Sequence, residues 1–529
     1  MDRIFLNGCI HTMDKYDTVA QAMSISGDTI TRIGSNEEVL KNNNDNAEIV
    51  DLHGKTVIPG LIDSHTHILW AATSELNGEL FIPQSIEELL DYVRERTKEL
   101  PEGQWIHLRN TYPTRLKEYR YPTIEELDKV SPRHPVFVDG AYAGRANSYA
   151  LKKAGICKNT PASAMIPAIK RCLKERPMSI QEYKQGIKNI QTEYNRLGIT
   201  SVIDGISDLV GVQAINELYD EGQLNVRIVF SKVVSQAKGA CDDMKTFKSH
   251  ISLPHKWGKL SFLKVMIDGG ILTGTSYMRR PYNDKIGIFD MPEGFRGIIN
   301  HDVKELIEFI DVAYNEGYQM SAHSIGDGAL DVLLSAYMEY GRKRDMTDRR
   351  FSIIHGDFTD DLTLNTIKAL NLILLFQPAW HFKDANILSK LLDHETMESF
   401  LPYAKYVDKG IYAAAGSDHM VKYHPLLSQN PYHPFWALYN MITRNTIDGR
   451  VIGGEQSIDR KEALKFYTWY GAYASFDEDK KGSLETGKLA DFAILSKDYF
   501  TCPVDDIPKI KSLFTVVGGN IVIDTIKCI

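Results

Sequence analysis

Cysteines are few in this sequence and are spread widely along it. The chain has 529 residues but only six cysteines, and no two of them form a Cys-x-x-Cys pair. This spacing argues against zinc–cysteine and thioredoxin-like sites. Because a chain of this length does not need disulfides to fold, we expect reduced thiols in a cytoplasmic protein.

Long apolar runs and an excess of positive charge are also missing. No apolar run approaches the ~18 residues that a membrane span requires, and residues 1–5 do not resemble the start of a secretory signal. The 61 Lys and Arg residues are outnumbered by 69 Asp and Glu residues, which leaves a formal charge of −8. Nucleic acids and anionic membranes attract concentrated positive charge, so neither is expected as a partner.

Short β-rich runs stand at both ends of the chain. Between residues 4 and 57 they are separated by turn formers such as Asn7-Gly8, and a similar pattern with a hairpin turn at 518–520 returns near the C-terminus. Since chain termini often lie close together, residues 1–57 and 479–529 are predicted to form one composite β-sandwich.

Residues 58–478 alternate apolar runs with segments of helical periodicity. Continuous apolar runs are typical of buried parallel strands, and they fall at 57–62, 199–203, 226–230, 262–267, 319–322, 351–354, 372–376 and 411–415. Eight such strands joined by crossover helices predict an α/β fold, a (β/α)8 TIM barrel. Functional residues of such a barrel lie at the carboxyl ends of its strands.

Residues 84–179 do not follow that alternation. They have helical periodicity at 86–100 and β-rich runs of their own at 105–108 and 135–138. We therefore predict an α/β insertion after the first barrel strand that covers the barrel mouth, and we call residues 84–179 the roof. The alternative is a set of long irregular loops.

Histidine is the residue type whose positions point to a function. His65 and His67 follow the first predicted strand, where residues i and i+2 share one face and can converge on one metal ion. The pair means little by itself, because a chain with 16 histidines contains such pairs by chance. Its place at the end of an apolar strand gives it weight.

Further polar residues interrupt other apolar strands. His323 ends the fifth strand, His355 the sixth and Asp418 the eighth, while Lys264 lies within the fourth. Burying each one without a partner would cost several kcal/mol. Four separately satisfied core residues are one explanation, and convergence at the barrel mouth accounts for all of them together. The four histidines and Asp418 offer nitrogen and oxygen ligands that suit Zn²⁺, with Mn²⁺, Fe²⁺ or Co²⁺ as alternatives.

Lys264 needs a separate account, because an ammonium group repels a cation and cannot ligate it. A lysine in this position can react with CO2 to form a carbamate, an anion able to bridge two metal ions. The expected cofactors are therefore one or two divalent ions, with a carbamate on Lys264 as a possibility.

Four sequence motifs resemble those of the amidohydrolase superfamily, and in particular of the amidohydrolase 3 family. They are residues 59–67 (PGLIDSHTH), 264–270 (KVMIDGG), 323–327 (HSIGD) and 482–491 (GSLETGKLAD). The resemblance covers nearly the whole chain. It implies a distorted TIM barrel with a small β-sandwich built from both ends of the chain.

The same resemblance implies roles for the polar residues. His65 and His67 would bind the more buried metal ion, His323 and His355 a second one, and a carboxylated Lys264 both. Asp418 would be metal ligand and proton acceptor. The roof lacks the Gly-His step that precedes an Asn-x-x-Ala-Leu run in many relatives, since 140–151 has no histidine. No particular substrate is therefore carried over.

The function expected from these residues is hydrolysis of a C–N bond in a small molecule, an amide, N-acyl or N-formyl compound. A metal-activated water would attack the carbonyl, and Asp418 would take its proton and return it to the leaving nitrogen. A deaminase and a lactone or cyclic amide hydrolase are alternatives on the same fold. A non-catalytic regulatory binding protein is the alternative from another class.

Substrate contacts are predicted from side chains that follow the fourth and seventh strands or adjoin Asp418: Tyr277, Arg279, Tyr282, Trp380, His381 and His419. Arg279 can hold a substrate carboxylate, or it can be a surface arginine paired with Asp284. Besides a small-molecule substrate, the expected partner is a second copy of the chain in a homo-oligomer, in the simplest case a dimer.

Overall fold

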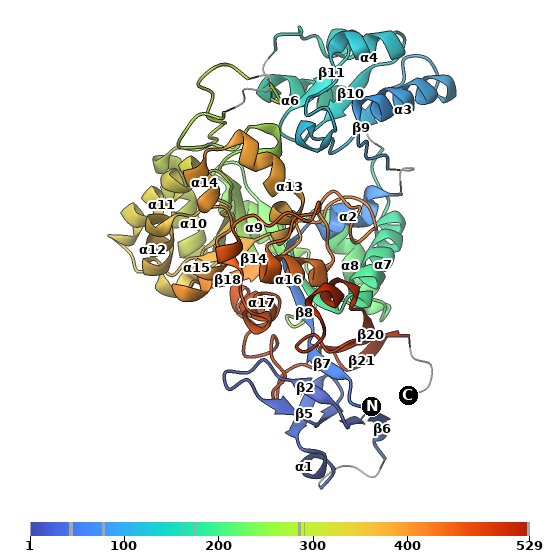
Figure 1. The fold of residues 1–529 in the computed structure, drawn as a ribbon, viewed down its shortest axis with the longest axis vertical. Helices are drawn as coiled ribbons and strands as arrows, with labels where there is room; N and C mark the ends of the chain where they lie inside the picture. The colour runs from blue at the N-terminus through green and yellow to red at the C-terminus, as the bar shows by residue number, and fades with distance from the viewer. Residues whose placement is uncertain are drawn as a thin grey trace.

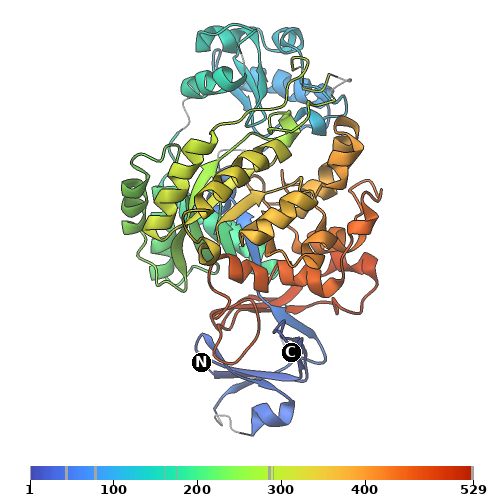
Figure 2. The same cartoon turned by 90° about the vertical axis from the view of Figure 1, so that its left-hand side faces the viewer.

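Eight parallel strands form the centre of the molecule in the computed structural model, which describes residues 2–41, 46–76, 80–160, 162–173, 176–283, 287–289 and 291–525 (Figures 1 and 2). Each strand pairs with the next one along the chain: β8 (Leu61–Thr66), β12 (Ile199–Asp204), β13 (Arg227–Val233), β14 (Gly258–Met266), β15 (Gln319–Ser324), β16 (Ser352–His355), β17 (Ile373–Phe376) and β18 (Ala413–Ala415). Past the strand ends, the amide of Asp418 donates to the carbonyl of His65 at 2.7 Å. The predicted eight-stranded barrel is confirmed. Its sheet is nearly closed between the first strand, β8, and the last, β18.

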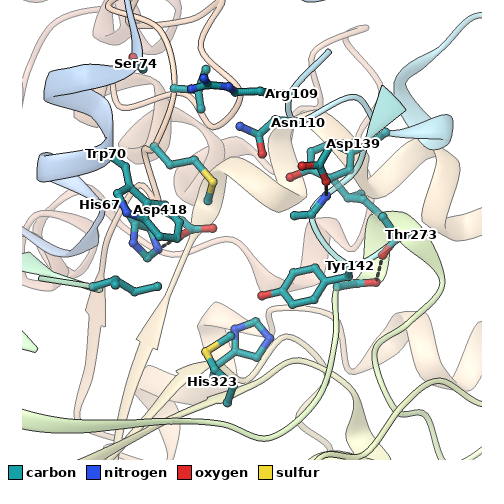
Figure 3. Close-up of a pocket in the computed structure, with 18 of the residues that line it drawn as sticks. His67, Trp70, Ser74, Arg109, Asn110, Asp139, Tyr142, Thr273, His323 and Asp418 are labelled. Carbon is teal, nitrogen blue, oxygen red and sulfur yellow. Dashed lines mark hydrogen bonds and ion pairs between the residues drawn. The ribbon is translucent and has the colours of Figure 1, made fainter. Parts of the chain in front are cut away.

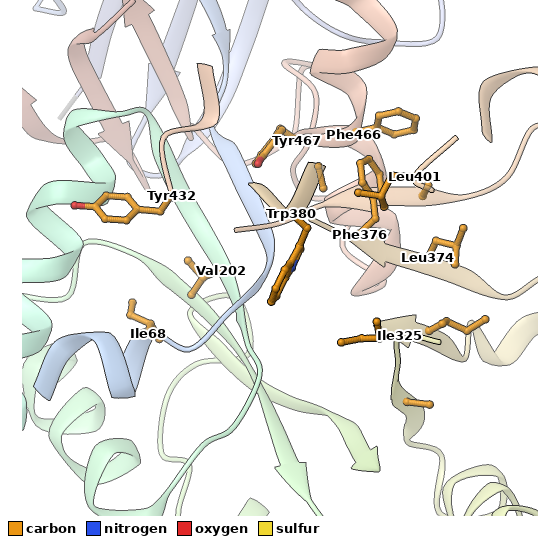
Figure 4. Packing of buried hydrophobic residues seen from close by; sticks show 14 of the residues in the cluster. Ile68, Val202, Ile325, Leu374, Phe376, Trp380, Leu401, Tyr432, Phe466 and Tyr467 are labelled. Atoms are coloured by element: carbon orange, nitrogen blue, oxygen red, sulfur yellow. The ribbon is translucent and has the colours of Figure 1, made fainter. Parts of the chain in front are cut away.

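Helices cover the outside of the barrel, and they do so because one face of each is apolar. In α10 (Val303–Glu316), Leu306, Phe309 and Ile310 are buried, and Asp302 caps the helix by accepting from the Glu305 amide. Other covering helices are α7 (Ile180–Arg196), α8 (Leu209–Asp220), α9 (Ala240–Ser249), α11 (Asp327–Gly341), α12 (Asp361–Ala369) and α13 (Pro378–Leu391). Figure 4 shows part of this apolar core, with Val202 of β12, Phe376 of β17 and Trp380 of α13 among its members.

The first predicted strand is two strands in the structure. The run at 57–62 divides at Gly60, so that β7 (Thr56–Pro59) joins the sandwich and β8 starts the barrel. A Cβ at Gly60 would lie only 2.2 Å from Oγ1 of Thr200, so the chain passes β12 too closely for any side chain. An apolar pattern continues across such a junction because both sides of it are buried.

Segments from both ends of the chain form the sandwich at the foot of the molecule (Figure 1). One sheet has the order β21-β20-β19-β7-β2-β3 and so combines strands from both ends, whereas the other, β5-β4-β1-β6, is entirely N-terminal. Their bounds are β1 (Asp2–Leu6), β2 (Cys9–His11), β3 (Val19–Ala20), β4 (Ala22–Ser26), β5 (Thr29–Gly34), β6 (Glu48–Asp51), β19 (Phe492–Leu495), β20 (Ser512–Val517) and β21 (Asn520–Asp524). A shared core including Phe5, Ile25, Phe492 and Val516 holds the two sheets together.

The roof lies at the opposite end of the barrel from the sandwich (Figures 1 and 2). Its described residues contain a three-stranded sheet of order β11-β10-β9, with β9 (Ile106–Leu108), β10 (Val136–Asp139) and β11 (Gly144–Ala146). They also contain four α-helices: α3 (Ile86–Glu99), α4 (Ile124–Val130), α5 (Ser148–Ala154) and α6 (Ala162–Cys172). Arg115 fastens it to the barrel, because its guanidinium makes a two-bond ion pair at 2.9 and 2.7 Å with Asp384 of α13. Asp384 is fully buried.

The sequence predicts neither disulfide bonds nor membrane-spanning helices. Five cysteines lie in the described residues and are free thiols, while Cys528 lies outside them. Among the helices of the described ranges, none is both long and apolar enough to cross a membrane.

Arg227 joins the barrel to the sandwich through a buried ion pair. It is only 1% exposed, and its Nε and Nη2 donate to Asp491, just before β19, at 2.7 and 2.9 Å. Its Nη1 donates to the carbonyl of Lys256, and the guanidinium lies over the ring of Trp257. Asp491 also accepts from the amide of Gly518.

Replacing Arg227 by Met is expected to destabilise the protein by about 3–5 kcal/mol, because it leaves the carboxylate of Asp491 buried without a cation. Thermal and denaturant unfolding measure the loss as a lower midpoint. The double variant Arg227→Met/Asp491→Leu is the control, since it removes both charges and should recover part of the stability. A single variant as stable as the native protein would contradict the assignment.

Candidate metal centre

A cavity of about 950 Å³ lies between the carboxyl ends of the barrel strands and the roof. The six polar residues predicted from the strands all contribute to its wall: His65, His67, Lys264, His323, His355 and Asp418. Figure 3 shows His67, Asp418 and His323 around this space, with roof residues such as Arg109 and Tyr142 across from them. The cavity therefore joins the strand ends to the roof in one site.

His65, His67 and Asp418 form the tightest group in the cavity. Each offers one ligand atom, and these three atoms lie within 4.8 Å of one another. Oδ1 of Asp418 is 3.4 Å from Nε2 of His65 and 3.2 Å from Nε2 of His67. Two imidazoles and one carboxylate are a donor set that suits Zn²⁺ and related divalent ions.

Three buried ring nitrogens in this group have no hydrogen-bond partner among the described residues: Nδ1 and Nε2 of His65 and Nδ1 of His67. An unsatisfied buried polar atom is costly and calls for an explanation. Desolvation holds the pKa of His65 well below its ordinary value and also lowers the pKa of His67. Both rings are therefore neutral, the form that ligates a metal, and the group fits a bound cation.

His323 and His355 form a second pair, and their outer contacts fix how the rings face each other. Nε2 of His323 lies 3.1 Å from the carbonyl of Gly269, and Nδ1 of His355 lies 2.6 Å from Oε1 of Gln377. Both partners are acceptors only, so both of these nitrogens carry the proton. The remaining nitrogens, Nδ1 of His323 and Nε2 of His355, are 3.0 Å apart.

Those two facing nitrogens each present a lone pair, because burial keeps the rings neutral. Desolvation lowers the pKa of His323 to about 3 and holds the pKa of His355 well below its ordinary value. Two lone pairs at this separation repel each other unless a cation accepts them. The His323–His355 pair therefore fits a second metal position.

Lys264 of β14 lines the same cavity and is 1% exposed. Within the described part of the chain its ammonium group makes no ion pair shorter than 4 Å. Desolvation lowers the pKa of Lys264 to about 8, although Asp418 and Asp204 oppose the shift. A buried lysine with a lowered pKa presents more of the neutral amine, the form that reacts with CO2.

Backbone strain marks two of the six residues. His355 and Asp418 have φ values of +75° and +52°, a region that residues other than glycine rarely adopt. Such conformations cost about 1–3 kcal/mol each and persist where the surroundings enforce them, commonly at functional sites. A glycine makes room nearby, since a Cβ at Gly205 would lie 2.5 Å from Cε1 of His65.

The carboxylate of Asp418 is held on both sides. While Oδ1 faces the two histidines, Oδ2 accepts a hydrogen bond from Nδ2 of Asn430 at 3.0 Å, and the same amide donates to the Asp418 carbonyl at 2.7 Å. Asn430 is buried in the loop after β18. The carboxylate is therefore fixed with one oxygen toward the metal group.

The family comparison agrees with this geometry. Residues 48–523 match the model of the Amidohydrolase family, which is most of the chain. The chain belongs to the amidohydrolase family. The resemblance predicted from the sequence motifs is confirmed.

Several known proteins are similar to this chain over almost its full length. N-substituted formamide deformylase of Arthrobacter pascens is 24% identical over 98% of this chain and 97% of its own. Protein LONG AFTER FAR-RED 3 of Arabidopsis thaliana is 28% identical over 98% of this chain and 91% of its own. A crystal structure of an uncharacterized metal-dependent hydrolase from Pyrococcus horikoshii OT3 superposes with a TM-score of 0.73 at 22% identity, covering 96% and 99% of the two chains. It supports the distorted TIM barrel with additional domains.

The structure places one of the substrate residues predicted for this amidohydrolase in the cavity wall. Of the six, Trp380 lines the cavity, whereas Tyr277, Arg279, Tyr282, His381 and His419 are absent from its described wall. Arg279 makes ion pairs with Asp331 and Asp360 at 2.6 and 2.5 Å, so its charge is already matched. Asp284, its expected partner, lies outside the described residues.

The other predicted substrate side chains make contacts within the protein. The hydroxyl of Tyr282 bonds to Ser276, and the ring of Tyr277 lies under the guanidinium of Arg296. His381 is buried against the carbonyl of Ile452, to which its Nε2 donates. A position after a barrel strand did not decide which side chains reach the cavity, since Trp380 lines it and the adjacent His381 is absent from its described wall. His419 is likewise held within the protein. Its Nδ1 lies at hydrogen-bond distance from the hydroxyl of Tyr194, and its Nε2 donates to the carbonyl of Lys422.

Gln377, Asn430 and Gly205 were not predicted as contributors to the site. Gln377 directly follows β17, so the strand-end rule that found His323 and His355 applies to it as well. Asn430 stands in an irregular loop twelve residues beyond Asp418, and no periodic pattern points to it.

Proposed function

We propose that this amidohydrolase hydrolyses a carbon–nitrogen bond of a small-molecule amide, N-acyl or N-formyl compound. The observation that carries the proposal is the convergence of buried, neutral and partly unpaired histidine nitrogens with one anchored carboxylate on a single cavity. A binding protein has no use for such an arrangement, because each of these buried polar groups is unfavourable without a cation.

His65, His67 and Asp418 would hold one divalent ion, and His323 and His355 a second. Zn²⁺ fits these donors best, with Mn²⁺, Fe²⁺ or Co²⁺ as alternatives. When bound, such ions lower the pKa of water and polarise a carbonyl oxygen. A carbamate on Lys264, formed from the neutral amine and CO2 with release of a proton, would supply an anionic ligand to both.

Asp418 would move the proton in the reaction. Its carboxylate accepts the proton of the attacking water as oxygen bonds to the carbonyl carbon, and then gives it to the nitrogen as the C–N bond breaks. The products are a carboxylic acid and an amine. Asn430 keeps Oδ2 in place, so that Oδ1 remains directed at the reacting atoms.

Metal analysis combined with a substrate screen tests the proposal. We expect about one or two tightly bound divalent ions per chain, and hydrolysis of N-formyl, N-acyl or cyclic amides by the metal-loaded protein. The variant His67→Ala should lose most of the metal and the activity together, with His394→Ala, an exposed histidine of α14 (His394–Glu398), as the control.

Other outcomes would favour the alternatives. Ammonia release from an amino-substituted ring, without amide cleavage, would favour a deaminase, and cleavage of lactones alone would favour an ester hydrolase. A chain that binds no divalent metal and cleaves none of these compounds would contradict the proposal and favour a binding protein.

A further inference from the structure

A tyrosine of the roof reaches the metal centre. Tyr142 lies in the turn between β10 and β11, and its side chain lines the same cavity as His323 and Asp418. The centroid of its ring is 5.8 Å from that of His323. Figure 3 shows its hydroxyl pointing away from the roof, into the space that His67, His323 and Asp418 surround. The roof therefore brings an O–H group to the place where the proposed reaction occurs.

The hydroxyl of Tyr142 is available to a ligand. It has no hydrogen-bond partner among the described residues, whereas the hydroxyl of Tyr183, which lines the same cavity, donates to Asp208 at 3.0 Å. Desolvation and the nearby carboxylate of Asp418 raise the pKa of Tyr142 well above its ordinary value. The phenol therefore keeps its proton at neutral pH and can donate it in a hydrogen bond.

The turn that carries Tyr142 is tightly held. Ala141 has a φ of +70°, a conformation that residues other than glycine rarely adopt. Its amide donates to Oδ1 of Asp139 at 2.8 Å, and the amide of Tyr142 donates to the carbonyl of Gly140 at 2.8 Å. Oδ2 of Asp139 in turn lies 3.1 Å from Nε2 of His107. Strain of this kind persists where the surroundings enforce it, commonly at functional sites, and here it directly precedes Tyr142.

A glycine of the barrel makes room for the tyrosine ring. A Cβ at Gly270, which follows β14, would lie 2.8 Å from Cδ2 of Tyr142. The backbone of Gly270 has φ −108° and ψ 140°, values that any residue can adopt, so its conformation does not require glycine. The lack of a side chain there instead lets the ring lie against the barrel wall. Roof and barrel are therefore fitted to each other at this ring.

We propose that Tyr142 is a catalytic residue whose hydroxyl donates a hydrogen bond to the carbonyl oxygen of the scissile amide. This inference rests on the proposed hydrolase function and adds a roof residue to its chemistry. As the water oxygen bonds to the carbonyl carbon, the π-electron pair of the C=O bond moves onto the carbonyl oxygen, and it returns as the C–N bond breaks. A fixed donor stabilises that negative charge, and Tyr142 keeps its own proton throughout.

Tyr142→Phe removes the hydroxyl and keeps the ring, so it isolates this hydrogen bond. We expect kcat on the best amide of the screen to fall by about a hundredfold with much less change in KM, because the bond strengthens as charge develops. Tyr149→Phe is the matched control, since Tyr149 lies in α5 of the roof but outside the described cavity wall, and its kcat should equal that of the native enzyme. Metal content and thermal unfolding check that both variants are loaded and folded.

A matched pair of substrates tells a direct hydrogen bond from a structural role. The two compounds are an amide and the corresponding thioamide, whose sulfur is a much weaker hydrogen-bond acceptor than oxygen. We expect the fall in kcat/KM caused by Tyr142→Phe to be about tenfold smaller for the thioamide than for the amide. Gly270→Ala, which displaces the same ring, should likewise affect the amide more than the thioamide. A variant that only misplaced the cavity wall would slow both compounds equally.

Binding of a tetrahedral analogue gives a readout that does not depend on turnover. The probe is the best amide with its carbonyl group replaced by a phosphonate, titrated calorimetrically into the metal-loaded protein. Its oxygens imitate the charged carbonyl oxygen, so Tyr142→Phe should bind it about tenfold or more weakly than the native protein does. Tyr149→Phe should bind it with native affinity.

The possible failures are distinguishable. Native kcat in Tyr142→Phe, or equal losses for the amide and the thioamide, would overturn the inference and leave the hydrolase intact. An oxygen-specific loss found in Tyr112→Phe but not in Tyr142→Phe would also overturn it, and would give the role to another tyrosine of the wall. If the native metal-loaded enzyme cleaves no amide at all, the proposed function fails, and the role of Tyr142 fails with it.

Discussion

Replacing Asp418 by Asn is expected to lower kcat by about a thousandfold while the protein stays folded and keeps much of its metal. Asparagine has nearly the same shape and can still accept the hydrogen bond of Asn430 through its carbonyl oxygen. It cannot take a proton from water, so the step that creates the nucleophile loses its acceptor. KM should change much less than kcat, because the loss concerns the transition state.

Steady-state kinetics on the best amide of the screen, with metal content measured on the same samples, tests this expectation. Asp331→Asn is the matched control, since it makes the same chemical change at an exposed carboxylate that pairs with Arg279 outside the cavity wall. Its kcat should be close to that of the native enzyme. Normal turnover by Asp418→Asn with full metal would remove Asp418 from the proton-accepting role.

Replacing Lys264 by Ala is expected to reduce activity by about a hundredfold or more, since it removes the carbamate ligand and weakens metal binding. The smaller side chain leaves space in the barrel interior, where Lys264 is 1% exposed. Formate or acetate can enter that space as a substitute anion, so adding these ions should restore part of the activity.

Lys264→Met provides the comparison. Its side chain fills the same volume but forms no carbamate and leaves no room for an added carboxylate, so we expect it to be as inactive as Lys264→Ala and not to be rescued. A carbon-13 signal from a carbamate on the native protein, formed with labelled bicarbonate, is an independent readout. If Lys264→Met retains native activity and metal content, Lys264 is not a ligand.

The barrel and its strand-end residues could be predicted because both follow local rules. A buried parallel strand is continuously apolar, so an isolated polar residue such as His323 or His355 stands out at its end. The strand register then brings the ends together without further information. Gly60 shows the limit of the rule, since the apolar pattern alone does not reveal where one strand ends and the next begins.

The substrate side of the cavity could not be predicted in the same way. Arg279 forms ion pairs with Asp331 and Asp360, which follow it by 52 and 81 residues in the sequence. No local pattern indicates partners at such separations. The same holds for the roof, where Arg109 and Arg171 line the same cavity although they are 62 positions apart in the sequence. Such contacts depend on how separate elements pack, which periodicity does not encode.

Arg115 has a consequence for how an enzyme of this shape can diversify. Its guanidinium grips Asp384 and also donates to the carbonyl of Gln429, the neighbour of the residue that steadies Asp418. Selectivity and chemistry are therefore built on one shared support. If the roof were exchanged for one that lacks a counterpart of Arg115, the loop that carries Asn430 would lose this contact and Asp418 would be held less firmly. Exchange of roofs among related enzymes should therefore preserve activity only when this arginine is kept.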